Sequence, residues 1–253
     1  MFENVPEQAE AKALLEAALA EGTAHAYLFH GPPGVGKRGL AVAFAAELLG
    51  EHERVGRGSH PDLYVLEPLG DQIRIDAIRE LRRDLHMRPF EADRRVYLIF
   101  GAHSMNEEAA DALLKDLEEP PPYAVIVLVA DDVGPLPETI RSRCQTLRFA
   151  PVDAESIEGF LGGRFKRPSE ETKLLSRVAA GRIGRALSTD LSVYRDRRKE
   201  MLGLIELLAS TAREVAYEFM GDIARADACT PVTLWQNVCL ATAVAPSIGY
   251  ELA

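Results

Sequence analysis

Five short apolar runs are spaced along the first 150 residues of the chain. They lie at Ala26–His30, Leu63–Leu66, Val96–Phe100, Ala124–Ala130 and Leu147–Phe149. Most of these runs are continuous rather than alternating in polarity, which is typical of strands that are buried on both faces. The pattern therefore predicts five strands of a parallel sheet.

Between these runs, apolar residues recur every three or four positions, as they do on one face of an amphipathic helix. The spacing predicts helices that contain Leu40, Phe44 and Leu48; Ile78, Leu81 and Leu85; and Ala110, Leu113, Leu114 and Leu117. Alternating strands and helices predict an α/β fold in which helices cover both faces of the parallel five-stranded sheet.

The third of these helices has recognisable ends. Asn106 is a good N-terminal cap, and Glu107 and Glu108 follow it where negative charge stabilises the helix dipole. Pro120–Pro122 cannot continue the helix, so we expect it to stop just before them.

After Phe149 the strand pattern ends and short helical segments follow, with a longer helix predicted through "YRDRRKEMLGLIELLAS". We expect an α/β domain over residues 1–150, a small helical domain over residues 151–190 and a helical segment over residues 191–253. The last part, from Asp227 onward, contains no Lys or Arg and is expected to be a poorly ordered tail.

Composition is that of a globular chain, with 47% hydrophobic and 27% charged residues among 253. No apolar run is long enough to span a membrane, and the acidic N-terminus lacks a signal-peptide core, so we expect a cytoplasmic protein. The three cysteines lack zinc spacing, so no metal is expected. A net charge of −10 argues against a basic surface all over, but it permits a local basic face.

The segment "GPPGVGKR", Gly31 to Arg38, follows a predicted strand and opens a predicted helix. That context is typical of a nucleotide-binding P-loop, whose backbone amides and helix N-terminus bind phosphates. The candidate nucleotide-binding residues are Gly31, Gly34, Val35, Gly36, Lys37 and Arg38. The alternative is a glycine-rich turn that binds nothing.

Two positions that support magnesium in ATPases are missing. Arg38 stands where a P-loop has the Ser or Thr that holds the metal, and a guanidinium cannot be a metal ligand. The strand Val96–Phe100 ends in Phe100–Gly101, without the carboxylate that an ATPase needs there. The two losses together predict that the chain does not hydrolyse ATP.

The motifs "YLFHGPPGVGK", "HPDL", "VYLIFGAHSMNEEAADALLKDLEEPP", "LPETIRSRCQTLRF" and "GRIGRAL" occur in this order, within a stretch from about Glu7 to Ser188. This set resembles the AAA+ subunits of the bacterial DNA polymerase III clamp loader, and among them it is most similar to the delta-prime subunits. The resemblance implies an AAA+ domain with a helical lid. It also implies a subunit without catalytic activity of its own within a holoenzyme that is a nucleotidyltransferase. The implied partners are motor ATPase and delta subunits, the sliding clamp and primed DNA.

The resemblance also implies roles for particular residues. Arg143 would act in trans as an arginine finger on a neighbour's ATP, and Arg185 would contact a phosphate from the lid. Arg79, Arg82 and Arg83 would contact DNA from a helix face opposite the apolar stripe. The alternatives are a surface salt bridge for Arg143, an exposed position for Arg185 and an ordinary solvated face for the other three.

Several departures from the family weaken nucleotide binding or leave other classes open. Asp131 and Asp132 occupy the region of a γ-phosphate sensor, where a carboxylate repels a triphosphate, so ATP or ADP is expected to bind weakly.

The stretch "LLGEHERVGRGS" lacks the family's four-cysteine zinc module, and about 50 residues after Met201 are too few for its helical collar. An autonomous AAA+ ATPase with an unusual metal shell is one alternative. A small-molecule phosphotransferase is another, although no acid or base candidate supports it.

Overall fold

The structure, a computed structural model, describes residues 2 and 5–225. The chain divides into two compact units, Met1–Thr189 and Asp190–Ala253, and each is described by itself. Among the described residues, the first unit contains the sheet and every helix except the one that begins at Leu191.

Five parallel strands form one sheet in the order β2-β3-β4-β1-β5. The strands are β1 Ala26–His30, β2 Leu63–Leu66, β3 Arg95–Phe100, β4 Ala124–Ala130 and β5 Gln145–Arg148. The prediction of a parallel five-stranded sheet is therefore confirmed. Strand β3 begins one residue earlier than predicted, at Arg95. Strand β5 is displaced from the predicted range, because this edge strand buries Leu147 alone and begins with polar residues that an apolar run does not include.

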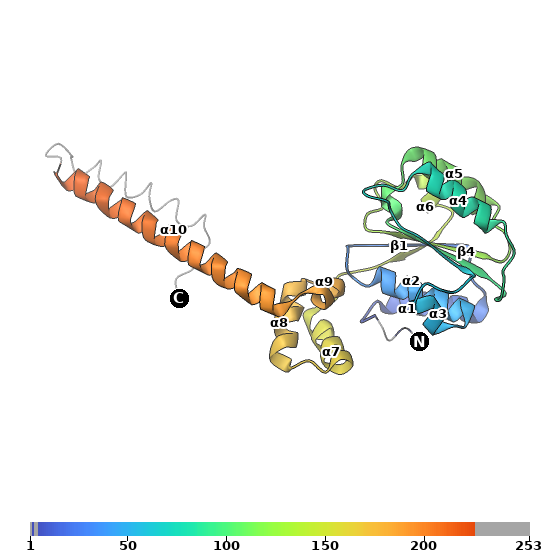
Figure 1. Ribbon diagram of the computed structural model, residues 1–253, viewed down its shortest axis with the longest axis horizontal. Coiled ribbons are helices and arrows are strands. Elements are labelled where there is room, and N and C mark those ends of the chain that lie inside the picture. Colours follow the sequence, from blue (N-terminus) through green and yellow to red (C-terminus); the bar gives the residue numbers. More distant parts are fainter. Residues whose placement is uncertain (1, 3–4, 226–253) are drawn as a thin grey trace. The chain divides into compact units, whose positions relative to one another are not determined.

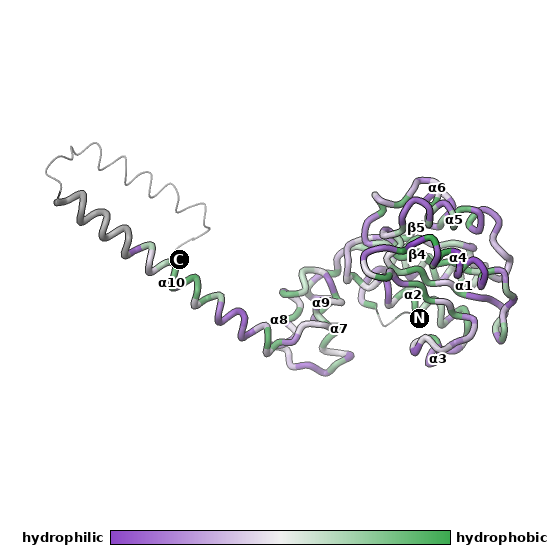
Figure 2. The backbone as a smooth tube through the Cα atoms, turned by 45° about the horizontal axis from the view of Figure 1, so that its top comes forward, coloured by the Kyte–Doolittle hydropathy of each residue, from purple (hydrophilic) through white to green (hydrophobic). Residues whose placement is uncertain are grey.

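Helices cover both faces of the sheet, as predicted (Figure 1). One face carries α1 Ala9–Glu21, α2 Lys37–Leu49 and α3 His52–Gly56, and the other carries α4 Ile75–Leu85, α5 Glu107–Glu118 and α6 Glu138–Arg141. A separate apolar core lies on each side of the sheet, and Figure 2 shows hydrophobic and hydrophilic residues alternating along the helices around it. Within the stripe predicted for α2, Leu40 and Phe44 are buried, but Leu49 is buried in place of Leu48.

The ends predicted for α5 are confirmed. The side chain of Asn106 accepts a hydrogen bond from the backbone amide of Ala109 at 3.0 Å, and Glu107 and Glu108 lie in the first turn. The helix ends at Glu118, two residues before the prolines.

Three short helices follow the sheet in the first unit: α7 Ala154–Phe165, α8 Ser169–Ala179 and α9 Ile183–Ser188. They pack on each other through buried Ile157, Leu161 and Leu175. The amide of Gly184 donates a hydrogen bond of 2.8 Å to the carbonyl of Gly34, which ties α9 to the loop after β1.

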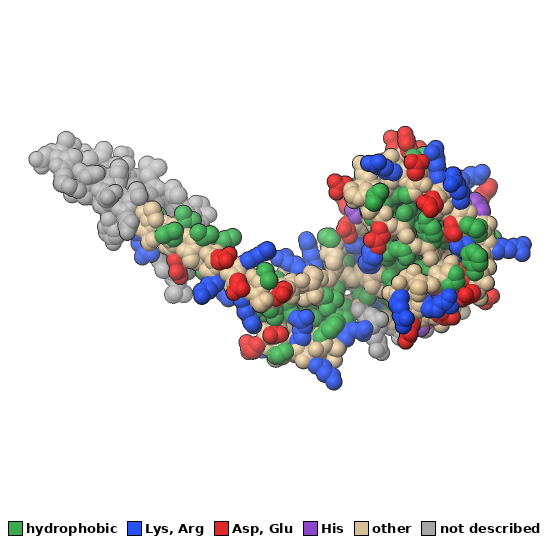
Figure 3. Space-filling model, in the orientation of Figure 1, with side chains coloured by type: hydrophobic (Ala, Val, Ile, Leu, Met, Phe, Trp, Pro, Cys, Tyr) green, Lys and Arg blue, Asp and Glu red, His purple; other side chains and the backbone are tan. Residues whose placement is uncertain are grey.

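The described part of the second unit is a single helix, α10 Leu191–Arg225. It contains the segment predicted to be helical, and several of its apolar side chains are exposed, including Leu204, Leu207 and Leu208 (Figure 3). The tail expected from Asp227 onward lies outside the described residues. Across the described part of the chain, no helix is long and apolar enough to cross a membrane.

Candidate functional site

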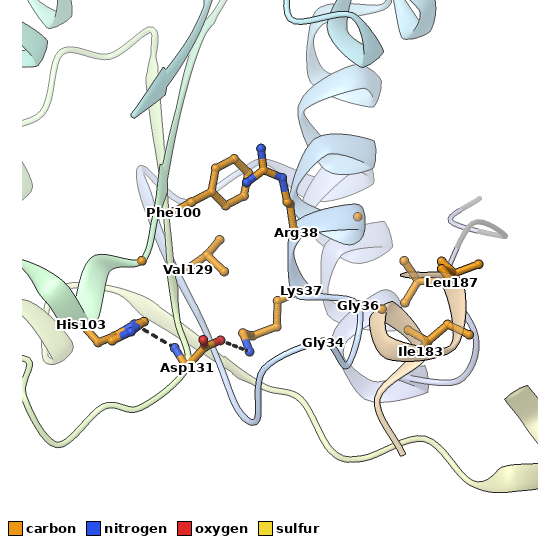
Figure 4. Close-up of a pocket in the computed structure, with 14 residues that line it drawn as sticks. Gly34, Gly36, Lys37, Arg38, Phe100, His103, Val129, Asp131, Ile183 and Leu187 are labelled. Atoms are coloured by element: carbon orange, nitrogen blue, oxygen red, sulfur yellow. Dashed lines mark hydrogen bonds and ion pairs between the residues drawn. The ribbon is translucent and has the colours of Figure 1, made fainter. Parts of the chain in front are cut away.

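Three neighbouring strands end at the same level on one edge of the sheet. His30 of β1 is paired with Ala130 of β4, and Phe100 of β3 is paired with Val129 of β4. This edge, at the carboxyl ends of parallel strands, is where α/β folds bind ligands. A cavity of about 450 Å³ lies there, lined by the loop after β1, the ends of β3 and β4, and α9 (Figure 4).

The glycines of the loop are required by the fold itself. Gly31 has a φ of 141°, and a Cβ atom at this position would lie 2.2 Å from the carbonyl oxygen of Phe149. Gly36 has a φ of 110°, and its Cβ would lie 2.6 Å from a methyl group of Val5. Val35, between them in the motif, is fully buried in the core. Part of the P-loop pattern therefore reflects close packing of the loop.

Lys37 is only 4% exposed, and its ammonium group has three acceptors. It donates to the carbonyl oxygens of Gly31 at 2.5 Å and Pro32 at 2.6 Å. It also forms an ion pair with Asp131 at 2.8 Å (Figure 4). Three donors with three acceptors leave the ammonium group fully satisfied. The backbone amide of Asp131 in turn donates to Nδ1 of His103 at 3.1 Å.

Arg38 brings the two departures from an ATPase together. Its guanidinium carbon lies 4.2 Å from the ring centroid of Phe100, within the range of a cation–π interaction (Figure 4). Its Nη2 forms an ion pair with Glu67. The residue in place of the metal-binding hydroxyl thus stacks on the residue in place of the acid. These side chains do not fit a magnesium ion, because a permanent positive charge and an aromatic ring stand where its ligands belong.

Arg185 does not join the cavity. Ile183, Gly184 and Leu187 of α9 line it, whereas Arg185 is exposed. At about 100° per residue, Arg185 projects from nearly the opposite side of this helix. Of the two interpretations left open by the sequence, the geometry agrees with the exposed position.

Arg143 follows α6 and is held at the surface by its own chain. Its guanidinium donates to the carbonyl of Thr139 at 2.8 Å and forms an ion pair of 2.6 Å with Glu118, at the end of α5. Its side chain is 34% exposed. Ser142 donates a local hydrogen bond to the carbonyl of Thr139, and neighbouring Cys144 is buried, which raises the pKa of its thiol to about 12.

The three arginines of α4 are not equivalent. Arg79 and Arg83 are exposed, and Arg79 pairs only with Asp76 of its own helix at 3.3 Å. Arg82 forms an ion pair with Asp116, which is 2% exposed on α5. This corrects the expectation that all three arginines lie opposite the apolar stripe, because a buried carboxylate on the next helix draws Arg82 toward the core.

Comparison with known proteins identifies the family. The family model described as "DNA polymerase III, delta subunit" matches residues 7–153, more than half of the chain. A DNA polymerase III subunit delta' of Pseudomonas aeruginosa is 36% identical over 174 residues, which are 62% of this chain and 53% of that protein. The delta' subunit of Bacillus subtilis is also 36% identical, over 53% of this chain and 44% of its own.

The chain belongs to the delta-prime family of DNA polymerase III clamp loader subunits. It spans about half the length of these curated relatives. The B. subtilis subunit tau is 33% identical over 62% of this chain and 30% of its own. The RuvB Holliday junction branch migration motor of Thermotoga maritima has the same fold, with a TM-score of 0.54, 19% identity and coverage of 79% of this chain and 64% of RuvB. These likenesses confirm the AAA+ fold.

In this delta-prime chain, one cluster of potential metal ligands includes a residue of the stretch that lacks the cysteine module. Glu51, His60 and Glu91 are the only such group of three within the described residues. Arg54 bridges the two carboxylates, at 2.9 Å from Glu51 and 2.7 Å from Glu91. Nδ1 of His60 accepts a hydrogen bond of 3.1 Å from the backbone amide of Asp62. The guanidinium of Arg54 thus lies between the carboxylates that a metal ion would need as ligands. The absence of structural zinc stays a prediction.

Two residues of the site were missed by sequence reasoning. Glu67 follows β2 directly and pairs with Arg38, and His103 lies just after β3 and holds the backbone of Asp131. Both come directly or shortly after the carboxyl end of a predicted strand. That position is the one signal in the sequence that would have pointed to them.

Proposed function

We propose that the chain is a non-hydrolysing subunit of the DNA polymerase III clamp loader, acting in the cytoplasm. It would help to load the sliding clamp onto primed DNA, together with motor ATPase and delta subunits. Membership of the delta-prime family supports this role, as do the relatives named tau and gamma among the similar chains.

The stacking of Arg38 on Phe100 is the observation that carries the proposal. Hydrolysis by P-loop proteins relies on a metal held by a hydroxyl and a carboxylate, and both positions are occupied here by groups that exclude it. An autonomous AAA+ ATPase is less well supported for the same reason. The retained loop would then serve the architecture of the subunit, while the chemistry takes place in a neighbour.

Arg143 would be this chain's contribution to that chemistry. A guanidinium is permanently charged and planar, so it can stabilise the negative charge that develops on a transferring phosphoryl group. Its contacts with Thr139 and Glu118 hold it at the surface, where a neighbouring subunit can be reached. To act on a neighbour's nucleotide, Arg143 would release the Glu118 carboxylate and bind a phosphate, so it would exchange one anionic partner for another.

Arg79 and Arg83 are the arginines of α4 that we propose to contact primed DNA. Both are exposed, and the pair between Arg79 and Asp76 is a surface pair of little strength. Contacts with backbone phosphates would be independent of sequence and sensitive to salt. Arg82 would act mainly through its ion pair with Asp116, which orients the helix.

The test is a clamp loader reconstituted with Arg143→Ala. We expect the complex to form, and its DNA-stimulated ATP turnover to fall, by up to roughly 10³-fold at the one site that loses its finger. Sites served by other arginines keep working, so total turnover falls less, and clamp loading suffers more if the sites act together. Arg143→Lys should restore little, because an ammonium lacks the planar fork.

Arg57→Ala is a matched control, since Arg57 is also an exposed arginine paired with a glutamate of its own chain. It should leave both clamp loading and turnover unchanged. Full activity of Arg143→Ala in a complex of verified composition would mean that Arg143 is only a salt-bridge residue.

A further inference from the structure

We propose that the cavity at the P-loop binds a nucleoside diphosphate without a divalent cation and discriminates against the triphosphate. The inference rests on the proposed function, because a subunit that does not hydrolyse ATP needs neither the metal nor the γ-phosphate. In this proposal the positive charge of Arg38 takes the role of the metal, and the negative charge of Asp131 takes the role of the γ-phosphate.

The start of α2 carries an unusual charge arrangement. Lys37 and Arg38 are the first two residues of this helix, where the helix dipole already favours negative charge. The first turn contains no acidic residue, and Gly36 provides no side-chain cap. Two cations at a helix N-terminus are unfavourable unless anions from outside the helix balance them, and Asp131 and Glu67 are the anions that do so here.

Arg38 supplies the positive charge that a metal would otherwise bring. Its planar guanidinium matches phosphate geometry and can donate two parallel hydrogen bonds to one phosphate group. Its present partner Glu67 is about half exposed, and surface pairs of this kind are weak and readily exchanged for a phosphate. A divalent cation would instead meet a fixed like charge, so it would add nothing to the binding of a diphosphate.

Asp131 supplies the negative charge of the missing third phosphate. The P-loop lysine is the group that contacts both the β- and γ-phosphates, and here its three donors are held by Asp131 at 2.8 Å and by the carbonyl oxygens of Gly31 and Pro32. A β-phosphate would displace the two carbonyl oxygens, which are neutral acceptors, and would leave the ion pair with Asp131 in place. A γ-phosphate would have to approach the carboxylate of Asp131, and two like charges in contact are strongly unfavourable.

The rest of the cavity suits the nucleoside. Val5, Ile183 and Leu187 offer an apolar rim against the polar loop. The cavity volume of about 450 Å³ lies within the range of roughly 300–1,000 Å³ that is usual for small-molecule sites. The site therefore combines an apolar wall for a base with a cationic helix terminus for two phosphates.

The test is calorimetric titration of the isolated full chain with ADP and with ATP, each in EDTA and in excess Mg²⁺. We expect ADP to bind in EDTA, with no tightening on addition of Mg²⁺, and ATP to bind roughly tenfold more weakly or worse. Absence of ADP binding in EDTA, a requirement for Mg²⁺, or equal affinity for ATP would each overturn the proposal. None of these results bears on whether Arg143 acts in trans.

Two variants assign the effect to residues. Asp131→Asn should strengthen ATP binding by roughly tenfold while ADP changes little, because it removes the competing charge and keeps the shape. Asp132→Asn is its matched control, since Asp132 makes no contact with Lys37 and only accepts from the amide of Gly134. Arg38→Ser should weaken ADP binding in EDTA by roughly tenfold. If the ratio of ADP affinity to ATP affinity did not change in Asp131→Asn, Asp131 would not be the residue that disfavours the triphosphate.

Discussion

The carboxylate of Asp62 shows how a single buried charge joins distant parts of this chain. It is completely buried and accepts hydrogen bonds from the backbone amides of Phe90 at 2.7 Å, Glu91 at 2.8 Å and Ala92 at 2.9 Å. Burial alone would raise the pKa of Asp62, but the three amide hydrogen bonds and the nearby Arg95 outweigh burial and lower it. The loop before β3 is thereby attached to the start of β2.

We predict that Asp62→Asn lowers the free energy of unfolding by roughly 2–3 kcal/mol at pH 7, because the charge is lost from three hydrogen bonds. A lowered pKa in the folded state means that this stabilisation is present above the ordinary Asp pKa and is lost as the pH falls below about 4. Urea unfolding of both proteins at pH 7 and pH 3 should show the difference shrinking. The control Asp76→Asn, at an exposed carboxylate, should change stability by about 0.5 kcal/mol or less. If Asp62→Asn lowered the free energy of unfolding equally at pH 7 and pH 3, the stabilisation could not come from the negative charge of Asp62.

At the scale of elements, the sequence predicts most where one local pattern decides the structure. The continuous apolar runs of β1 and β4 gave the observed bounds, since both strands are buried on both faces. Edge strand β5 was displaced because its burial alternates. The pairing of Arg82 with Asp116 and the rotation of Arg185 away from the cavity depend on how helices pack, which spacing along one helix does not reveal. Local patterns thus predict the elements, and tertiary packing decides which side chains reach the site.

The N-terminal cap of α5 is a local feature with a measurable effect. Asn106→Ala should lower the free energy of unfolding by about 1 kcal/mol, because the amide of Ala109 loses its acceptor. Asn106→Ser keeps a side-chain oxygen and should recover most of this loss. Chemical unfolding of the three proteins side by side is the measurement, and equal stability of the Ala and Ser variants would show that the cap does not stabilise the helix.

At the scale of the whole molecule, the chain keeps the AAA+ fold and its P-loop but lacks both side chains that support a metal for hydrolysis. We predict that the isolated chain hydrolyses ATP no faster than buffer with Mg²⁺ present, since Arg38 and Phe100 replace both metal supports. Steady-state phosphate release is the measurement. A rate near the ordinary enzyme range of about 1 per second, abolished by Lys37→Ala, would show that the chain is an ATPase in its own right.

The most direct test of the central claim compares two residues of this chain within one reconstituted clamp loader. DNA-stimulated ATP turnover is measured for complexes that carry Lys37→Met or Arg143→Ala, at matched salt and verified composition. We expect Lys37→Met to keep turnover within about twofold of the unmodified complex and Arg143→Ala to lower it clearly. The reverse result, with turnover lost in Lys37→Met and kept in Arg143→Ala, would contradict the claim that this chain contributes its arginine rather than its P-loop.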